Sequence, residues 1–193
     1  MRRKVGILAL QGDFEAHASI LRSLGAEPRE VRVPADLEGL DALIIPGGES
    51  TVMTLGIARE GLDEPLRGLA RSGVPVLGTC AGMIMLDREH LGVLDICASR
   101  NAFGRQLRSF EADLDLEGVE GGPLHAVFIR APWVAEYGDD VEVLARVDGH
   151  PVAVRQGTVL AVAFHPELAG ETRLHRLLLE MNGDALLTGT DGA

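Results

Sequence analysis

Hydrophobic positions follow two different patterns along the chain, and the change falls near its middle. The first half contains short β-branched and aliphatic runs, each followed by a stretch with helical spacing, such as Ala18, Leu21 and Leu24 ahead of Gly25. These runs predict strands at 4–10, 30–33, 41–45 and 74–78, and helices from 13 and at 50–59, 64–71 and 81–89. Strands that alternate with helices indicate a parallel sheet covered on both faces.

The second half lacks long helices until its end. Strand-like runs follow one another at 107–116, 126–130, 142–147, 152–155 and 158–164. Two connections look like hairpin turns, Asp148-Gly149 and Gln156-Gly157. The chain closes with a helix, ended by Gly183, whose apolar face carries Leu174, Leu177, Leu178 and Met181. We therefore expect a three-layer α/β fold with a flavodoxin-like, mostly parallel sheet and an antiparallel extension, as one domain over 1–187 with a frayed tail at 188–193.

Composition narrows the class of protein. A chain of 193 residues, 46% of them hydrophobic, can build a core without a disulfide or a structural metal. A formal net charge of −11 without a basic stripe opposes nucleic-acid binding. Two cysteines in unlike contexts and no membrane-length apolar stretch favour a soluble cytoplasmic protein. Metal-ligand spacing is missing, so we expect no metal and surface positions for the histidines at 17, 90, 125, 150 and 175.

The strongest candidate for chemistry is the small-residue turn Gly78-Thr79-Cys80-Ala81-Gly82. It lies between a buried strand and a helix, which is the nucleophile-elbow pattern with cysteine in place of serine. The helix that begins beside Cys80 places partial positive charge near its sulfur and favours the thiolate. A small buried cysteine is the alternative, and the elbow context argues against it.

A thiolate nucleophile needs an acid–base partner, and Phe164-His165-Pro166-Glu167 offers one at the end of the last strand. Residues two apart in an extended segment point the same way, so His165 and Glu167 can project together. Glu167 can then orient the imidazole while its other nitrogen faces Cys80. Taken alone, this segment is more often a capped turn before a helix, and the cysteine elbow is what favours the triad.

A second glycine-rich turn, Pro46-Gly47-Gly48-Glu49-Ser50-Thr51, follows the strand that ends at Ile45. Glycines let the backbone approach a substrate or turn an N–H toward an oxyanion. With the N–H of Ala81, an N–H of this turn would form an oxyanion hole with two donors. A plain strand-to-helix turn with Ser50 as the N-cap is the alternative, and the turn lacks the GK[ST] ending of a Walker loop.

These three segments, in this order, resemble the class I glutamine amidotransferases. Further stretches are similar to the glutaminase subunits of pyridoxal 5'-phosphate synthases, and they cover 6–12, 46–51, 100–106, 128–132 and 164–168. The resemblance runs from the first strand to the last helix, although the segment 87–94 is shorter than in that family.

The resemblance implies a role for each matching residue. Cys80 would be the nucleophile, His165 the base and acid, and Glu167 its orienter. It also implies an oxyanion hole from Gly48 and Ala81, and glutamine contacts from Gly48, Glu49, Ser50, Arg100, Ile129 and Arg130. Glutamine carries an α-ammonium, which suits Glu49, and an α-carboxylate, which suits an arginine.

The family also implies a partner. Its members bind no cofactor and pass ammonia to a (β/α)₈-barrel synthase in a hetero-oligomer, and they are poorly active alone. We therefore predict that the loop at Gly47-Gly48 is misaligned until docking. Three alternatives remain open: a glutaminase that serves another synthase, such as that of imidazole glycerol phosphate, a peptidase, and a redox-sensing cysteine protein of similar fold.

Overall fold

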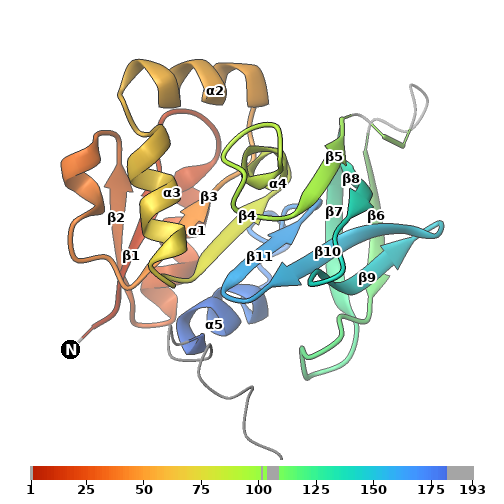
Figure 1. Cartoon of the computed structure of the whole chain (residues 1–193). Helices are drawn as coiled ribbons and strands as arrows, with labels where there is room; N and C mark the ends of the chain where they lie inside the picture. The colour runs from red at the N-terminus through yellow and green to blue at the C-terminus, as the bar shows by residue number, and fades with distance from the viewer. Residues whose placement is uncertain (1, 101, 104–108, 182–193) are drawn as a thin grey trace, which may run out of the picture.

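The computed structural model of the chain describes residues 2–100, 102–103 and 109–181 (Figure 1). Its centre is a seven-stranded sheet of order β2-β1-β3-β4-β11-β10-β9. The expected helix end at Gly183, the domain boundary at 187 and the tail at 188–193 lie outside the described residues, as does the start of the strand expected from 107.

Five neighbouring strands of this sheet run parallel and two extend it antiparallel. The parallel part has the flavodoxin-like order, so the expected sheet with its antiparallel extension is confirmed. The parallel strands are β2 (Glu27–Val31), β1 (Lys4–Leu8), β3 (Ala42–Ile45), β4 (Val76–Thr79) and β11 (Val159–Val162), and the extension is β10 (His150–Gln156) and β9 (Glu142–Val147).

Helices cover both faces of the sheet (Figure 1). The helix between β1 and β2 lies on one face of the sheet. The helices that follow β3 and β4 lie on the other face, as right-handed crossovers require. The last helix packs beside the first through His17 and His175. The helices are α1 (Phe14–Ser23), α2 (Ser50–Arg59), α3 (Asp63–Arg71), α4 (Ala81–Leu86), α5 (Arg173–Glu180) and the short 3₁₀ helix η1 (Pro34–Leu37).

Two further ribbons lie outside the main sheet. Strand β6 (Ser109–Leu114) pairs with β7 (Leu124–Ile129), and β5 (Ile96–Ser99) pairs with β8 (Trp133–Tyr137), each antiparallel. The prediction that the later strands form an antiparallel extension of the main sheet was therefore wrong for β6 and β7, which pair apart from it, and for β11, which runs parallel to β4. Strands β5 and β8 were not predicted, because they are short and partly exposed and carry little of the alternation that marks a strand.

The helix that follows the cysteine elbow is shorter than expected. It was predicted to reach residue 89 but ends at Leu86, and Asp87 adopts an extended conformation. The Asp87 carboxylate accepts the N–H groups of Glu89 and His90 at 2.9 and 3.1 Å. An aspartate that bonds to the backbone ahead of it favours a turn over a continued helix.

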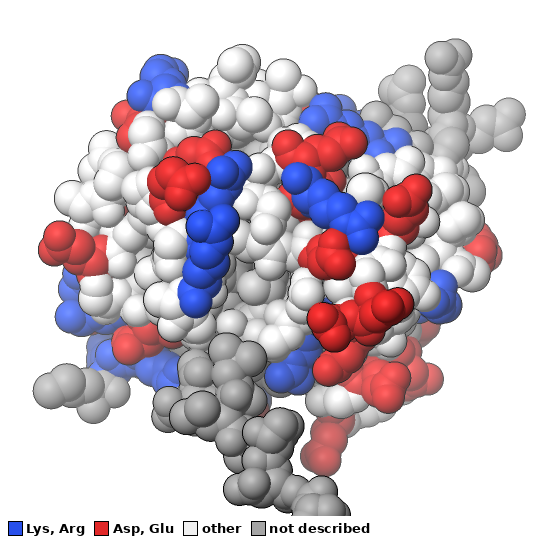
Figure 2. Space-filling view, in the orientation of Figure 1, with Lys and Arg blue, Asp and Glu red and all other residues white. Residues whose placement is uncertain are grey.

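The sheet is buried between its helices, and its central strands β3, β4 and β11 are buried along their whole length. Across the described ranges, no helix is long and apolar enough to cross a membrane. The face seen in Figure 2 carries acidic and basic side chains interleaved, without a continuous basic stripe on that side.

Candidate active site

The loops that follow four parallel strands meet at one edge of the sheet. They leave β1, β3, β4 and β11 at their carboxyl ends, where ligands bind in sheets of this order. A pocket of about 310 Å³ opens there. It is lined by Gln11, Gly48, Glu49, Ser50, Cys80, Ala81, Ile84, Arg100, Ile129, Arg130, Pro132 and His165. Apart from Glu167, every candidate residue predicted from the sequence lines this single pocket.

Cys80 occupies a sharp turn between β4 and α4. Its φ of +48° lies in the left-handed region, which is costly for a residue with a side chain and is typical of active sites. The turn depends on small neighbours: a methyl group at Gly82 would overlap the carbonyl oxygen of Ile45, and one at Gly78 would lie 2.8 Å from the Gly82 backbone. The two glycines therefore let α4 start directly against the sheet.

His165 and Glu167 form a close pair behind the pocket. Nδ1–H of His165 donates to Glu167 Oε1 at 2.7 Å, and the Glu167 side chain is fully buried. Burial alone would lower the pKa of His165, but its hydrogen bonds and charge interactions with Cys80 and Glu167 outweigh burial and raise it to about 10. The imidazole is therefore protonated at neutral pH.

Gly47 brings the nucleophile and the imidazole together. A methyl group at this position would lie 2.5 Å from Cε1 of His165 and 3.3 Å from Cβ of Cys80. Both side chains therefore pack directly on the bare glycine. The Cys80 sulfur also lies 3.8 Å from the carbonyl oxygen of Ile129, at the end of β7.

The glycine turn after β3 is fixed at both ends. The N–H of Gly47 donates to Thr79 Oγ1 at 3.1 Å, and the N–H of Glu49 donates to Gln11 Oε1 at 2.6 Å. Within the described part of the chain, the N–H groups of Gly48 and Ala81 have no protein acceptor. Both residues line the pocket that also holds Cys80.

Glu49, rather than Ser50, is the N-cap of α2, which corrects the alternative considered for this turn. Its carboxylate accepts the N–H groups of Val52 at 2.9 Å and Thr51 at 3.3 Å, and these bonds, with the charge of Arg100, lower its pKa. A carboxylate has about four acceptor positions, so two remain for a ligand. Ser50 is buried beside it and lines the pocket.

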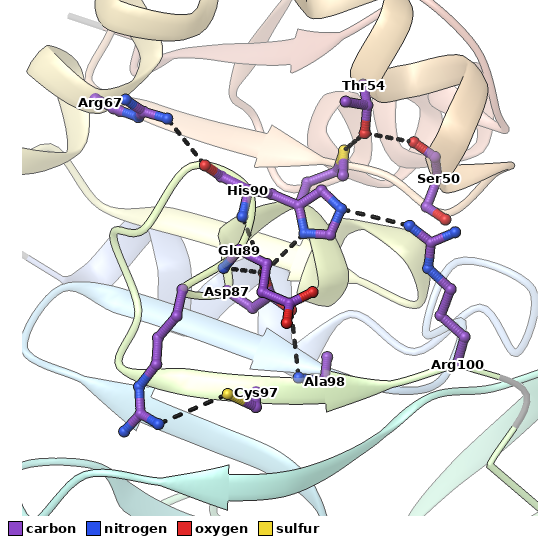
Figure 3. A network of polar contacts seen from close by, with 11 residues as sticks. Ser50, Thr54, Arg67, Asp87, Glu89, His90, Cys97, Ala98 and Arg100 are labelled. Carbon is purple, nitrogen blue, oxygen red and sulfur yellow. Dashed lines mark hydrogen bonds and ion pairs between the residues drawn. The ribbon is translucent and has the colours of Figure 1, made fainter.

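Arg100 reaches the pocket from the end of β5 and is held by polar contacts (Figure 3). Its guanidinium donates to Thr51 Oγ1 and to His90 Nε2, each at 3.4 Å. His90 Nδ1–H in turn donates to the buried carboxylate of Asp87 at 2.7 Å. Arg130 also lines the pocket, is exposed and has a φ of +45°.

Sequence reasoning missed several residues of the site. Gln11, Ile84 and Pro132 line the pocket without having been predicted there. The expectation that His17 and His175 lie on the surface was wrong, because both are completely buried where α1 meets α5. Helical spacing could have signalled this, since each histidine neighbours the apolar face of its helix. The described residues contain no cluster of ligands that could hold a metal ion.

A cysteine elbow after the fourth parallel strand, with histidine and glutamate after the fifth, places this molecule among proteins with the class I glutamine amidotransferase fold. The sequence comparison is more specific. The chain belongs to the SNO glutamine amidotransferase family, whose model matches residues 7–183.

Curated relatives of the chain carry the name pyridoxal 5'-phosphate synthase subunit PdxT, and two of them illustrate the similarity. The protein of Frankia alni is 55% identical over 187 residues, covering 92% of this chain and 94% of the relative. That of Acidothermus cellulolyticus is 55% identical over 194 residues, covering 93% and 94%.

Solved structures agree with this assignment. A crystal structure of a glutamine amidotransferase is 50% identical, with a TM-score of 0.86 over 92% of this chain and 97% of that one. The structure of PurLQS from Thermotoga maritima shares 20% identity and a TM-score of 0.71 over 93% and 98%, which shows the fold alone.

Proposed function

We propose that this chain hydrolyses L-glutamine to L-glutamate and ammonia as the glutaminase subunit of a pyridoxal 5'-phosphate synthase, and that it supplies the ammonia to the synthase subunit. One observation in the chain carries the proposal. Cys80 and His165 both pack on Gly47 in a pocket of about 310 Å³, with the buried carboxylate of Glu167 behind the imidazole. This volume suits a small-molecule substrate.

The first half of the reaction forms a thioester. The Cys80 thiolate attacks the side-chain carbonyl carbon of glutamine, and the carbonyl oxygen becomes an oxyanion facing the N–H groups of Gly48 and Ala81. The protonated imidazole of His165 gives its proton to the leaving nitrogen. Collapse of the tetrahedral intermediate breaks the C–N bond, releases ammonia and leaves a γ-glutamyl thioester on Cys80.

The second half returns the enzyme to its starting state. Neutral His165 takes a proton from water, and the resulting hydroxide attacks the thioester carbonyl. The same two N–H groups face the second oxyanion. Expulsion of the Cys80 thiolate gives glutamate, and His165 is again protonated. Glu167 stays ionised throughout and stabilises the imidazolium.

The two charged groups of glutamine are recognised at the rim of the pocket. The free acceptor positions of Glu49 receive the α-ammonium, and Arg100 binds the α-carboxylate with Arg130 facing it. Ser50 and Ile129 contact the chain of the substrate between them. Arg100 is the better placed arginine, since Thr51 and His90 already hold its guanidinium.

The partner in this proposal is a (β/α)₈-barrel synthase bound as a hetero-oligomer. Docking aligns the Gly47-Gly48 loop, so hydrolysis is slow until the ammonia has a recipient. Both cysteines are free among the described residues. A reducing cytoplasm suits such an enzyme because its nucleophile must remain a thiol.

The test is glutamate release from glutamine by the purified chain, with and without the synthase subunit. Release that rises at least about tenfold with the synthase, and that is abolished in Cys80→Ala, supports both the chemistry and the partner. Release that persists in Cys80→Ala would reject the nucleophile. No release by the wild type with the synthase would reject the proposed function.

A further inference from the structure

Two buried histidines outside the triad lie directly behind Glu167. His17 from α1 and His175 from α5 are both fully buried, and Nδ1 of His17 lies 2.8 Å from Nε2 of His175. On its other side, Nε2 of His17 lies 3.4 Å from Glu167 Oε2 and 3.4 Å from Thr79 Oγ1. Polar groups therefore continue without a break from His165 through Glu167 to this histidine pair.

The histidine pair faces a buried oxygen of Glu167 that lacks a hydrogen bond. Oε1 of Glu167 is bonded to His165, whereas the fully buried Oε2 has no hydrogen-bond partner among the described residues. An unpaired carboxylate oxygen in the interior is costly. Nε2 of His17 is the ring nitrogen that faces it, and a movement of about half an ångström would bring it within ordinary hydrogen-bond distance.

Both rings of the pair are neutral. Burial, followed by the charges of His175 and His165, holds the pKa of His17 well below its ordinary value. Burial lowers the pKa of His175 to about 4, although the backbone and then the charge of Glu171 act to raise it. Each ring therefore carries a single N–H, and the position of one proton decides the position of the other.

Only one of the two possible proton arrangements serves Glu167. A carboxylate can only accept, so His17 must carry its proton on Nε2, and its bare Nδ1 then accepts from Nε2–H of His175. The opposite arrangement points a lone pair of His17 at Glu167. It also leaves the buried Oε2 of Glu167 without any donor among the described residues, since only the Thr79 hydroxyl faces the same ring nitrogen of His17. A buried carboxylate oxygen without a donor is costly, so the first arrangement is favoured.

We infer that His17 is a positioning residue of the glutaminase site: its Nε2–H holds Glu167 and thereby orients His165, while His175 fixes the required tautomer of His17. The inference rests on the proposed function for its catalytic consequence. His17 also contacts Thr79, whose hydroxyl oxygen accepts the N–H of Gly47. It therefore links the triad to the turn that carries the oxyanion donor.

Two variants of His17 distinguish a role of its N–H in positioning Glu167 from a role of its side chain in packing. Gln can place an N–H near the position of Nε2, whereas Leu fills similar space without a donor. With the synthase present, we expect His17→Leu to lower kcat for glutamine by about 10–100-fold with KM within about twofold, as for other partners that orient a functional histidine. His17→Gln should recover at least about a third of the wild-type kcat. Exposed His125 on β7 provides the control, since His125→Ala should change neither constant.

A second readout needs neither glutamine nor the synthase. The rate of Cys80 alkylation by iodoacetamide, followed against pH and assigned by peptide mass spectrometry to distinguish Cys97, reports on the thiolate–imidazolium pair. His17→Leu should change this pH profile, and His17→Gln should restore it. A Leu variant with wild-type kcat and a wild-type alkylation profile would overturn the inference. Absence of glutamine hydrolysis by the wild type would instead reject the proposed function and leave the alkylation test valid.

The tautomer can be tested in the unmodified protein. ¹⁵N NMR of the His17 ring should show a protonated Nε2 and a bare Nδ1 at neutral pH. In His175→Leu, which removes the neighbouring donor, the population of this tautomer should fall. A protonated Nδ1 in the wild type would overturn the inference even if His17→Leu does not fold.

Discussion

The pocket has two halves that are built differently: the proposed function assigns the reaction to one half and the recognition of glutamine to the other. The reaction half, formed by Gly47, Cys80, His165 and Glu167, is mostly buried and so closely packed that a single methyl group at Gly47 would displace the imidazole. The recognition half, formed by Glu49, Arg100 and Arg130, is exposed. Its arginine contacts measure 3.4 Å, against 2.7 Å between His165 and Glu167.

This difference predicts which kinetic constant each half controls. A buried and closely packed group cannot move to compensate for a change, so errors in the reaction half should appear in kcat. Exposed charges are solvated before glutamine arrives and can be replaced partly by water. Changes in the recognition half should therefore appear mainly in KM.

The largest effect is expected for Glu167→Gln in the reaction half. The amide keeps the size of the side chain but removes the charge that stabilises the imidazolium of His165. We expect kcat to fall by on the order of 10³–10⁴, as when the acid of a serine triad is replaced by its amide, with KM within about threefold. Glu64→Gln on the exposed surface of α3 is the control. A large rise in KM would remove the distinction between the halves.

Acid should destabilise the protein through the buried histidine pair behind the reaction half, His17 and His175. The pKa of His175 is about 4 in the folded protein, below its ordinary 6.5. Between these two pH values, the unfolded chain therefore binds a proton that the folded chain does not bind. The contribution of neutral His175 to the free energy of unfolding is therefore fully present above pH 6.5. It falls by on the order of 3 kcal/mol as the pH drops from 6.5 to 4. Urea unfolding against pH should show this slope, and His175→Leu should flatten it. An unchanged slope in His175→Leu would show that the acid loss arises elsewhere.

Two alanine substitutions compare a closely packed glycine beside the reaction half, Gly82, with an exposed glycine on α3, Gly68. A methyl group at Gly82 overlaps the carbonyl oxygen of Ile45, so Gly82→Ala should lower the free energy of unfolding by about 2–3 kcal/mol. Gly68, on the exposed side of α3, has no neighbour within 4 Å of the added group. Gly68→Ala should therefore stabilise the protein by about 0.5–1 kcal/mol. Denaturant unfolding that gave both variants the same sign would contradict this comparison.

The sequence predicted the reaction half better than the recognition half, for a physical reason. Cys80, His165 and Glu167 each follow a buried parallel strand, and hydrophobic runs mark such strands clearly. The carboxyl ends of neighbouring parallel strands meet at one edge, and Cys80 and His165 approach each other there. Their pairing was predicted from the two motifs, because the strand before His165 was expected in the antiparallel extension and instead runs parallel to β4.

Contacts that depend on tertiary packing could not be predicted in this way. The contact between His17 and His175 joins two helices 158 residues apart, and local spacing does not report such a distance. The partly exposed strands β5 and β8 lack a strong alternation of apolar and polar residues. Strand β5, which has Arg100 at its end, was therefore not predicted. Arg100 itself was predicted through the family resemblance and not through the pattern of its neighbours.

Arg100→Ala should have a moderate effect, confined to binding. In the proposed binding mode Arg100 is the charged hydrogen-bond partner of the α-carboxylate. Its loss at an exposed site is worth about 1.5–2 kcal/mol, which corresponds to a rise in KM of about 10–30-fold. We expect kcat within about threefold of the wild type, because the reacting atoms lie in the other half. Steady-state kinetics with the synthase measures both constants, with Arg59→Ala at the end of α2 as the control. A fall in kcat without a change in KM would place Arg100 in the reaction half.

The smallest expected effect concerns His90, which supports Arg100 from outside the pocket. His90 Nδ1–H donates to Asp87, which leaves Nε2 as an acceptor for the guanidinium (Figure 3). His90→Leu removes this acceptor and should raise KM by about 3–5-fold, because Thr51 still holds the other guanidinium nitrogen. His90→Gln, which can offer an amide oxygen, should restore part of the affinity.

A double-mutant cycle decides whether His90 acts through Arg100. If it does, His90→Leu should have no further effect on KM once Arg100 has been changed to alanine, since the coupled contact is already absent. Equal rises in KM on both backgrounds would mean that His90 acts through the Asp87 turn and not through the arginine. Because the contact is long and partly solvated, the coupling should stay near 1 kcal/mol, well below the effect of any change in the reaction half.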